Sequence, residues 1–225
     1  MTSRWKLIIE YNGLPFNGWQ SQRDISGVQD FLSQAIKGFC GEDVKIFAAG
    51  RTDSGVHAHG QVAHFDLERV TDCNELREAL NSHLKPHPIA ILNAEEVTDK
   101  FHARFSAIKR HYQYGIINRR APLTLDKGKY WRVGKNLDIE PMIKASKYLL
   151  GNHDFTTFRS THCQSRSPIK TIDIIKIQKE RLEIKIIVSA RSFLHNQVRS
   201  IVGSLKLVGE GKWDERKIKE ILEGR

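Results

Sequence analysis

The stretch that decides the fold is "VKIFAAGRTDSGVHAHGQVAHFD", Val44 to Asp66. Two runs, Val44–Ala49 and Gln61–Asp66, are typical of β-strands, and they flank a loop rich in glycine, histidine and arginine. Because loops on a rigid sheet often carry binding and catalytic side chains, the loop's carboxylate, Asp53, is the first candidate functional residue. Asp-Ser-Gly is also ordinary turn chemistry, so this loop alone establishes no function.

The flanking sequence predicts the element order βαββαβ. A strand at Trp5–Tyr11 and a helix opening near Ser26 precede the stretch, and a helix capped by Asp72 and a strand at Ile89–Val97 follow it. The fold class is therefore α/β of the α+β type, in the order of a ferredoxin-like unit with an antiparallel sheet. Two helices would cover one face of that sheet and leave the other open to bind or to pack.

The second half of the chain repeats the pattern as βαββα. The expected elements are Ala107–Asn118, Ile139–Leu150, Ile172–Gln178, Leu182–Ser189 and Phe193–Val208, with a last helix at Asp214–Leu222. We therefore expect two ferredoxin-like domains, residues 1–106 and 107–225, whose sheets join around a central functional cleft. The second unit would lack its final strand, which would leave a sheet edge open.

The composition indicates which class of partner the protein binds and in which compartment it works. Lys and Arg total 36 against 26 Asp and Glu, and the net charge of +10 favours a polyanion, nucleic acid first. The three cysteines lie far apart without a C-x-x-C pair, which argues against a disulfide framework and a thiolate zinc site. The sequence shows neither a signal-peptide pattern nor an apolar run approaching roughly 18 residues. We expect a cytoplasmic protein that does not bind membranes.

Three histidines near Asp53 raise the possibility of a metal site. His57 and His59 have a spacing that could ligate zinc on a strand, and His64 follows them. A second carboxylate or thiolate cluster that would complete a ligand set is missing from the pattern, so we do not expect a metal site. A metal-dependent hydrolase remains an alternative, which chelator sensitivity would reveal.

The segment "AGRTDSGVHAHGQVAHF", Ala49 to Phe65, resembles the signature of the TruA family of tRNA pseudouridine synthases, in which the matching Asp is catalytic. Further blocks similar to that family occur in the same order, and together they span nearly the whole chain. These blocks are "EYNGLPFNGWQSQ" (Glu10–Gln22), "FHARFSAIKRHYQYGIIN" (Phe101–Asn118), "LLGNHDFTTFR" (Leu149–Arg159) and "SFLHNQVRSIVGSLKLVGEGK" (Ser192–Lys212). The resemblance implies a cofactor-independent isomerase that converts uridine to pseudouridine in the tRNA anticodon stem-loop, at positions 38, 39 and 40, and acts as a homodimer.

The resemblance also implies roles for particular residues. Asp53 would act on the uridine as a nucleophile or as a base, Arg199 would form an ion pair with it, and Tyr112 would stack on the base. On an alternating strand Tyr112 shares a face with Arg110 and Tyr114. The basic side chains expected to contact RNA phosphates are those of Arg51, Arg104, Lys109, Arg110, Arg159 and Arg166.

Two features depart from the family pattern. Asn196 stands where the family usually has a histidine, and the chain ends at "EILEGR" without the closing strand of the second sheet. If that truncation disables the chemistry, the alternative is a non-catalytic RNA-binding module on the same scaffold. Replacing Asp53 by Asn would leave the function of such a module intact.

Overall fold

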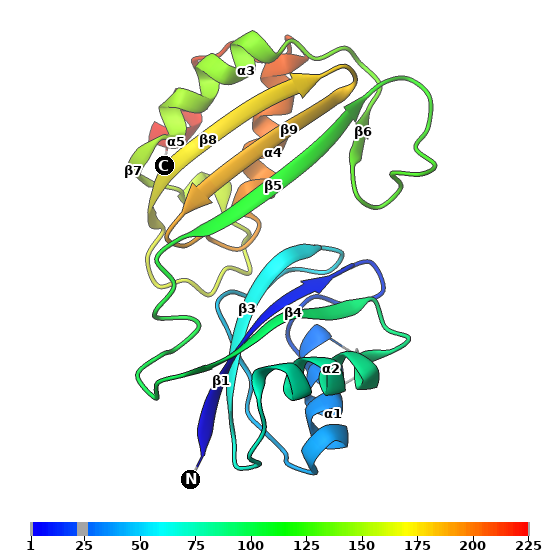
Figure 1. Ribbon diagram of the computed structural model, residues 1–225. Helices are drawn as coiled ribbons and strands as arrows, with labels where there is room; N and C mark the ends of the chain where they lie inside the picture. Colours follow the sequence, from blue (N-terminus) through cyan, green and yellow to red (C-terminus); the bar gives the residue numbers. More distant parts are fainter. Residues whose placement is uncertain (1, 22–26, 225) are drawn as a thin grey trace. The chain divides into compact units, whose positions relative to one another are not determined.

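The computed structural model describes residues 2–21 and 27–224, so Ser26 lies outside the described residues. The chain divides into two compact units, residues 1–107 and 108–225 (Figure 1). Each unit has its own sheet and its own hydrophobic core, which makes the protein a mixed α/β structure, as the sequence predicts. No helix in the described parts of the chain is long and apolar enough to cross a membrane.

The first unit has the predicted order βαββαβ. Its elements are β1 (Ser3–Tyr11), α1 (Val28–Cys40), β2 (Phe47–Ala48), β3 (Ala58–Leu67), α2 (Cys73–Leu84) and β4 (Ile89–Val97). The strands form one antiparallel sheet in the order β2-β3-β1-β4, and both helices lie on the same face of it (Figure 1). β2 is shorter than the predicted strand Val44–Ala49, and β3 begins three residues before the predicted one.

The core of the first unit lies between the sheet and its helices. Trp5, Leu7, Ile9 and Tyr11 alternate along β1 and are all buried, because successive side chains of a strand point to opposite faces. As expected, Asp72 caps α2, and its carboxylate accepts the amides of Asn74 and Glu75 at 2.8 and 2.9 Å.

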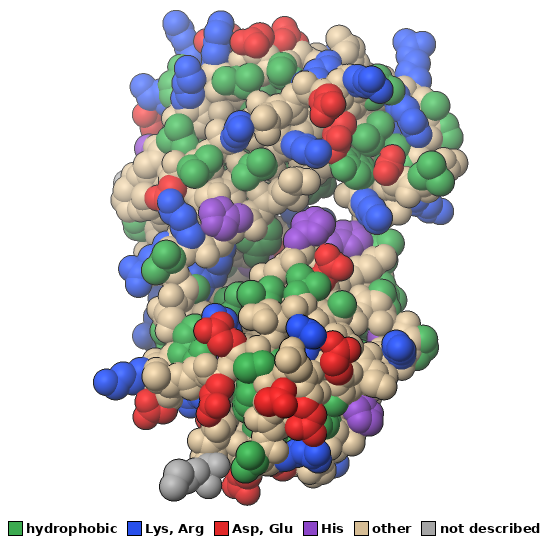
Figure 2. Space-filling view, in the orientation of Figure 1, with side chains coloured by type: hydrophobic (Ala, Val, Ile, Leu, Met, Phe, Trp, Pro, Cys, Tyr) green, Lys and Arg blue, Asp and Glu red, His purple; other side chains and the backbone are tan. Residues whose placement is uncertain are grey.

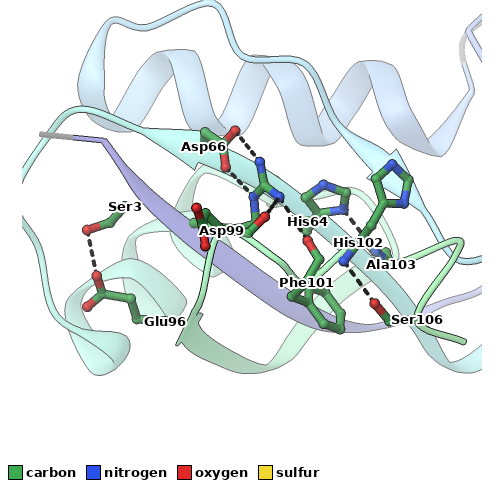
Figure 3. Close-up of polar contacts among 10 residues, drawn as sticks. Ser3, His64, Asp66, Glu96, Asp99, Phe101, His102, Ala103 and Ser106 are labelled. Carbon is green, nitrogen blue, oxygen red and sulfur yellow. Dashed lines mark hydrogen bonds and ion pairs between the residues drawn. The ribbon is translucent and has the colours of Figure 1, made fainter.

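The opposite face of this sheet is covered in part by the chain that follows β4, residues 98–106, which we call the cover segment. The guanidinium of Arg4 pairs with both carboxylate oxygens of Asp66, at 2.6 and 2.8 Å, and donates to the carbonyl of Phe101 at 2.9 Å. His64 accepts the amide of Ala103 at 3.1 Å through Nδ1 (Figure 3). This face of the sheet is thus used for packing, one of the two expected uses, because side chains on the strands hold the segment's backbone.

His64 is buried in a neutral state beneath the cover segment. Only 1% of it is exposed, and this burial, reinforced by the nearby His102 and Arg4, lowers its pKa from 6.5 to about 4. Since Nδ1 accepts the Ala103 amide, we assign the proton of the neutral ring to Nε2. Protonation of Nδ1 would both charge the ring and remove the acceptor for that amide.

The second unit contains two short strands that the sequence did not predict. Its elements are β5 (Arg110–Asn118), β6 (Trp131–Val133), α3 (Ile139–Ser146), β7 (Gly151–Asp154), β8 (Ile169–Glu180), β9 (Glu183–Ala190), α4 (Gln197–Gly209) and α5 (Lys217–Glu223). The sheet order is β6-β5-β9-β8-β7. The edge of β5 that was expected to be open is therefore partly covered, because β6 pairs in parallel with Ile116–Asn118.

One buried side chain holds β6 and the following residues against the end of β5. The Nδ2 of Asn118 donates to the carbonyls of Val133 and Lys135, at 2.9 and 2.7 Å, and its Oδ1 accepts the amide of Leu137 at 2.9 Å. A side-chain amide thus supplies hydrogen bonds that a longer strand would take from its neighbour. Such a contact leaves no periodic signal in the sequence.

α4 begins later than the predicted helix start at Phe193. Asn196, which precedes its first residue, has φ of +61°, a left-handed conformation that an α-helix cannot include. Asn tolerates this conformation better than most residues. Beyond that point the prediction is confirmed, and Val202 and Leu205 of α4 are buried in the core of the second unit.

Acidification should destabilise the protein through His64. In the unfolded chain His64 takes up a proton near pH 6.5, whereas in the folded chain its pKa is about 4. The stability that neutral His64 contributes is therefore fully present above pH 6.5, and it falls as the pH drops from 6.5 to 4. The free energy of unfolding in urea should decline by up to about 1.4 kcal/mol per pH unit. His64→Gln, which keeps an acceptor for Ala103, should flatten this slope, whereas His59→Gln at an exposed position should not. Equal slopes in all three proteins would contradict the assignment.

Removing the Asn118 side chain should destabilise the second unit. Asn118→Ala leaves two carbonyls and one amide without their partner, and we expect a loss of about 2 kcal/mol or more in the free energy of unfolding. The matched control is Asn152→Ala on β7, whose amide makes an exposed bond to Thr171, with an expected change within about 0.5 kcal/mol. Urea titration of both variants is the measurement, and equal losses would count against the role of Asn118.

Candidate active site

Asp53 lies in a tight turn between β2 and β3. Its carbonyl accepts the amide of Val56 at 3.1 Å, and Gly55 within the turn has φ of +74°, which favours glycine. The Asp53 residue is half-buried and its neighbour Arg51 is exposed. The turn is thus the one expected from Asp-Ser-Gly, and it sits at the start of a long strand of a rigid sheet.

A second segment, residues 11–19, packs against this turn. The amide of Trp19 donates to the carbonyl of Thr52 at 3.0 Å, and the hydroxyls of Tyr11 and Thr52 lie 2.8 Å apart. The amide of Gly13 donates to Nδ1 of His57 at 3.2 Å. Both flanks of Asp53 are therefore bonded to a segment that belongs to a different part of the sequence.

Two glycines make this close approach possible. A Cβ on Gly13 would lie 2.0 Å from the carbonyl oxygen of Val56, and a Cβ on Gly18 would lie 2.5 Å from that of Thr52. Gly18 also has φ of +91°. Any other residue at either position would push the segment away from the turn. Sequence reasoning identified the block that contains these glycines but not this contact.

The three histidines near Asp53 have different contacts and do not converge on one point. His57 accepts the amide of Gly13, His59 is exposed with its Nδ1 4.0 Å from the carboxylate of Glu10, and His64 is buried under the cover segment. Within residues 2–21 and 27–224, no group of three or more His, Cys, Asp or Glu side chains is placed to hold a metal ion.

In the second unit, Tyr112 lies on the face of the sheet that packs against helices. Arg110, Tyr112 and Tyr114 share this face with the buried Ile116, as predicted from the alternation along β5. The ring of Phe193, just before α4, stands perpendicular to that of Tyr112 at a centroid distance of 5.2 Å. This edge-to-face packing orients the Tyr112 ring.

Arg199 lies in the first turn of α4 and is exposed. Burial raises the pKa of Tyr114, and the positive charge of Arg199 opposes that rise, which places Arg199 within electrostatic reach of the face that carries Tyr112. The amino end of a helix carries a partial positive charge, and α4 has no acidic residue in its first turn. The helix end and the guanidinium of Arg199 therefore both favour an anion at this place.

The predicted RNA-contacting residues are distributed over both units. Arg51 and Arg104 are exposed in the first, and Arg166 is exposed in the second. Lys109 lies 3.5 Å from the carboxylate of Asp173, and Arg110 donates to the carbonyl of Arg191. Arg159 is half-buried next to a short 3-10 turn.

The positive charge of the chain is concentrated in the second unit. Lys and Arg outnumber Asp and Glu by 25 to 12 in residues 108–225, whereas acidic residues lead by 14 to 11 in residues 1–107. In the view of Figure 2, Lys and Arg side chains (blue) are scattered over the unit that carries α3 and β8 rather than gathered in one block. Attraction to a polyanion should therefore come mainly from the second unit.

Gly18→Ala should cost more stability than the same change at a glycine with similar backbone conformation and open space around it. Gly41 has φ of +79°, and a Cβ added there would meet no described atom within 4 Å, so Gly41→Ala measures the left-handed strain alone, about 1 kcal/mol. At Gly18 the clash with the Thr52 carbonyl should add about 1–3 kcal/mol. Urea unfolding of the two variants gives the difference, and equal losses would show that the close approach is unimportant.

Known proteins share most of the sequence of this chain. A family model described as tRNA pseudouridine synthase matches residues 7–106 and 145–225. Proteins named tRNA pseudouridine synthase A are 59% identical in Parvibaculum lavamentivorans, covering 97% of this chain and 89% of the relative, and 57% identical in Xanthobacter autotrophicus, covering 93% and 86%. The relative of the same name from Bradyrhizobium diazoefficiens is 54% identical, with 99% and 91% covered. The chain belongs to the tRNA pseudouridine synthase family.

Proposed function

We propose that this chain isomerises uridine to pseudouridine in tRNA without a cofactor, with Asp53 as the essential carboxylate. The observation that carries the proposal is the fixed turn around Asp53. Hydrogen bonds from Trp19 and Gly13 hold both sides of that turn, and the family match covers the same residues. A carboxylate in a rigid, half-buried turn is positioned before the substrate arrives, which is what catalysis by positioning requires.

The reaction is an isomerisation, so the substrate supplies all the atoms and electrons of the product apart from protons exchanged with solvent. The bond between N1 of the base and C1′ of the ribose breaks, the base turns, and a new bond joins C5 to C1′. The proton on C5 leaves to solvent and N1 gains a proton, so no electrons are exchanged with another molecule. Asp53 serves either as the nucleophile that forms a covalent intermediate or as the base that begins an elimination. Both routes need the ionised carboxylate.

Arg199 and Tyr112 have complementary roles in the proposal. Burial disfavours a charged carboxylate and a nearby guanidinium favours it, so we assign Arg199 as the ion-pair partner of Asp53 during the reaction. The position of Arg199 at the amino end of α4 supports an anion-binding role. Tyr112, braced by Phe193, stacks on the extruded base and offsets part of the few kcal/mol that extrusion costs.

The charge distribution supports a path for the RNA backbone over the second unit. Arg159 and Arg166 on that unit, with Lys109 and Arg110 near the start of β5, would contact phosphates, and Arg51 and Arg104 would do so from the first unit. If about six phosphates are contacted, affinity should fall by roughly 10³ between 50 and 200 mM salt. We further propose the anticodon stem-loop as target, at positions 38, 39 and 40, and a cytoplasmic homodimer as the active form.

Asp53→Asn should abolish the reaction and leave tRNA binding in place. The amide has nearly the shape of the carboxylate but cannot act as a nucleophile or base. The measurement is tritium release from unmodified tRNA labelled at uridine C5, in the presence of a chelator. The parent should release tritium, Asp53→Asn should stay at background, and the control Asp43→Asn, at an exposed carboxylate paired with Lys37, should match the parent.

Three other outcomes would change the proposal. Release by Asp53→Asn at the parent's rate would remove Asp53 from the chemistry. Tritium release that occurs only when the chelator is left out would favour a metal-dependent reaction. Tight tRNA binding by a parent that releases no tritium would favour the non-catalytic RNA-binding module. In an active parent, tRNAs with cytidine at position 38, 39 or 40 would identify which uridines react.

A further inference from the structure

Four rings on the first unit form a continuous column from the sheet to the surface. Phe47 on β2 stacks on His64 at a centroid distance of 5.0 Å and an angle of 16°, and His64 contacts His102 at 4.6 Å. His102 in turn contacts Phe105 at 4.4 Å. The inner rings belong to strands of the sheet and the outer rings to the cover segment, and Figure 3 shows His64 and His102 at their junction.

The outer end of the column is open. Phe105 is 74% exposed, although one side of its ring rests on His102. A large aromatic side chain held in water is unfavourable, and its exposure is informative when the chain around it is fixed rather than loose.

The backbone that carries Phe105 is fixed on both sides. The amide of Ala103 is bonded to His64, and the carbonyl of Phe101 is bonded to Arg4, which is itself held by Asp66. Beyond Phe105, the amide of Ser106 donates to the carbonyl of His102 at 2.8 Å, and its hydroxyl accepts the amide of His102 at 3.0 Å. The segment is therefore a small closed turn anchored to buried side chains, and Phe105 is presented at its tip.

The electrostatics of the first unit indicate the type of contact. Acidic residues outnumber basic ones in residues 1–107, so this unit attracts RNA weakly by charge. A contact made by stacking does not depend on net charge, because every base has a π face. Arg104 beside Phe105 could meet the adjacent phosphate.

The ring column is separated from the Asp53 turn along β3. The Asp53 turn leads into β3 at Ala58, and His64 lies six residues further along that strand, which corresponds to about 20 Å. A base held at Phe105 would therefore be several nucleotides away from the one at Asp53. Binding of that kind is the same in the ground state and the transition state, so it lowers KM without raising kcat.

We propose that Phe105 is a stacking platform for an unpaired base of the tRNA, remote from the target uridine, and that the ring column and the Arg4 and His64 anchors hold it in place. The inference rests on the proposed function, since it takes tRNA as the substrate. It adds a positioning residue whose contribution is sequence-tolerant and independent of salt.

The test compares substitutions at Phe105 in the full chain with unmodified tRNA. Phe105→Ala should weaken the Kd and raise KM by about 5- to 100-fold, the loss expected for one stacked base, with kcat at saturating tRNA unchanged. Phe105→Leu should lose about as much, because it keeps the apolar surface without a π face. Phe105→Trp should bind tRNA as tightly as the parent, and the fluorescence of the added tryptophan should be quenched by tRNA.

Two control variants separate stacking from other effects. Val70→Ala removes another apolar side chain of the same unit, 94% exposed, and should leave Kd unchanged. Arg104→Ala should reduce the slope of log Kd against log salt concentration by about 1, whereas Phe105→Ala should shift the affinity equally at all salt concentrations. Sedimentation of each variant checks the oligomeric state.

Several results would overturn the inference. An active parent whose affinity is unchanged in Phe105→Ala would exclude the stacking contact and leave the proposed function standing. Loss of affinity together with a change in oligomeric state would show that the ring contacts a second copy of the chain. Equal losses in Phe105→Trp and Phe105→Ala would exclude aromatic stacking. A parent that neither binds tRNA nor releases tritium would overturn the proposed function and this inference together.

Discussion

The first unit's part of the candidate site depends on the close approach between residues 13–19 and the Asp53 turn. Two backbones can come this near only because Gly13 and Gly18 have no Cβ. Tyr11 and Trp19, which bond to Thr52 in the turn, are themselves buried in the core of the unit. The position of the carboxylate is therefore set by the packing of the core rather than by the loop's own preferences.

In the proposed function, the two units contribute different chemical groups to one reaction. The first supplies a carboxylate in a rigid turn and has little attraction for RNA, and the second supplies most of the positive charge, an oriented tyrosine and an arginine at a helix end. The first turn of α4, with Arg199, favours an anion, and the ring of Phe105 is exposed to water at a fixed position. RNA binding would explain both features, since the phosphate would meet the positive charge and a base would cover the exposed ring. Sites that are arranged before the substrate arrives often show such features.

Much of the fold could be predicted because its long elements have strong periodic patterns. β4 and the cap of α2 at Asp72 agree with the prediction, since alternation and capping are local signals. β6 and β7 have three and four residues, too few for a pattern, and β6 is held by the side chain of Asn118. The cover segment escaped prediction because it binds side chains more than 35 positions away in sequence. Likewise, the sequence indicates Asp53 through its neighbours, but the roles of Gly13 and Gly18 depend on a contact across the fold.

The division of charge also bears on the order of events when the protein meets RNA. Long-range forces act first, and they draw any polyanion toward residues 108–225 with little regard for its identity. Discrimination must then come afterwards, from short-range contacts that hold a correct RNA for longer than an incorrect one. Fidelity in such a protein is a matter of residence time, not of capture rate. Moderate salt, by shortening every purely electrostatic encounter, should sharpen the choice among RNAs while it slows the search.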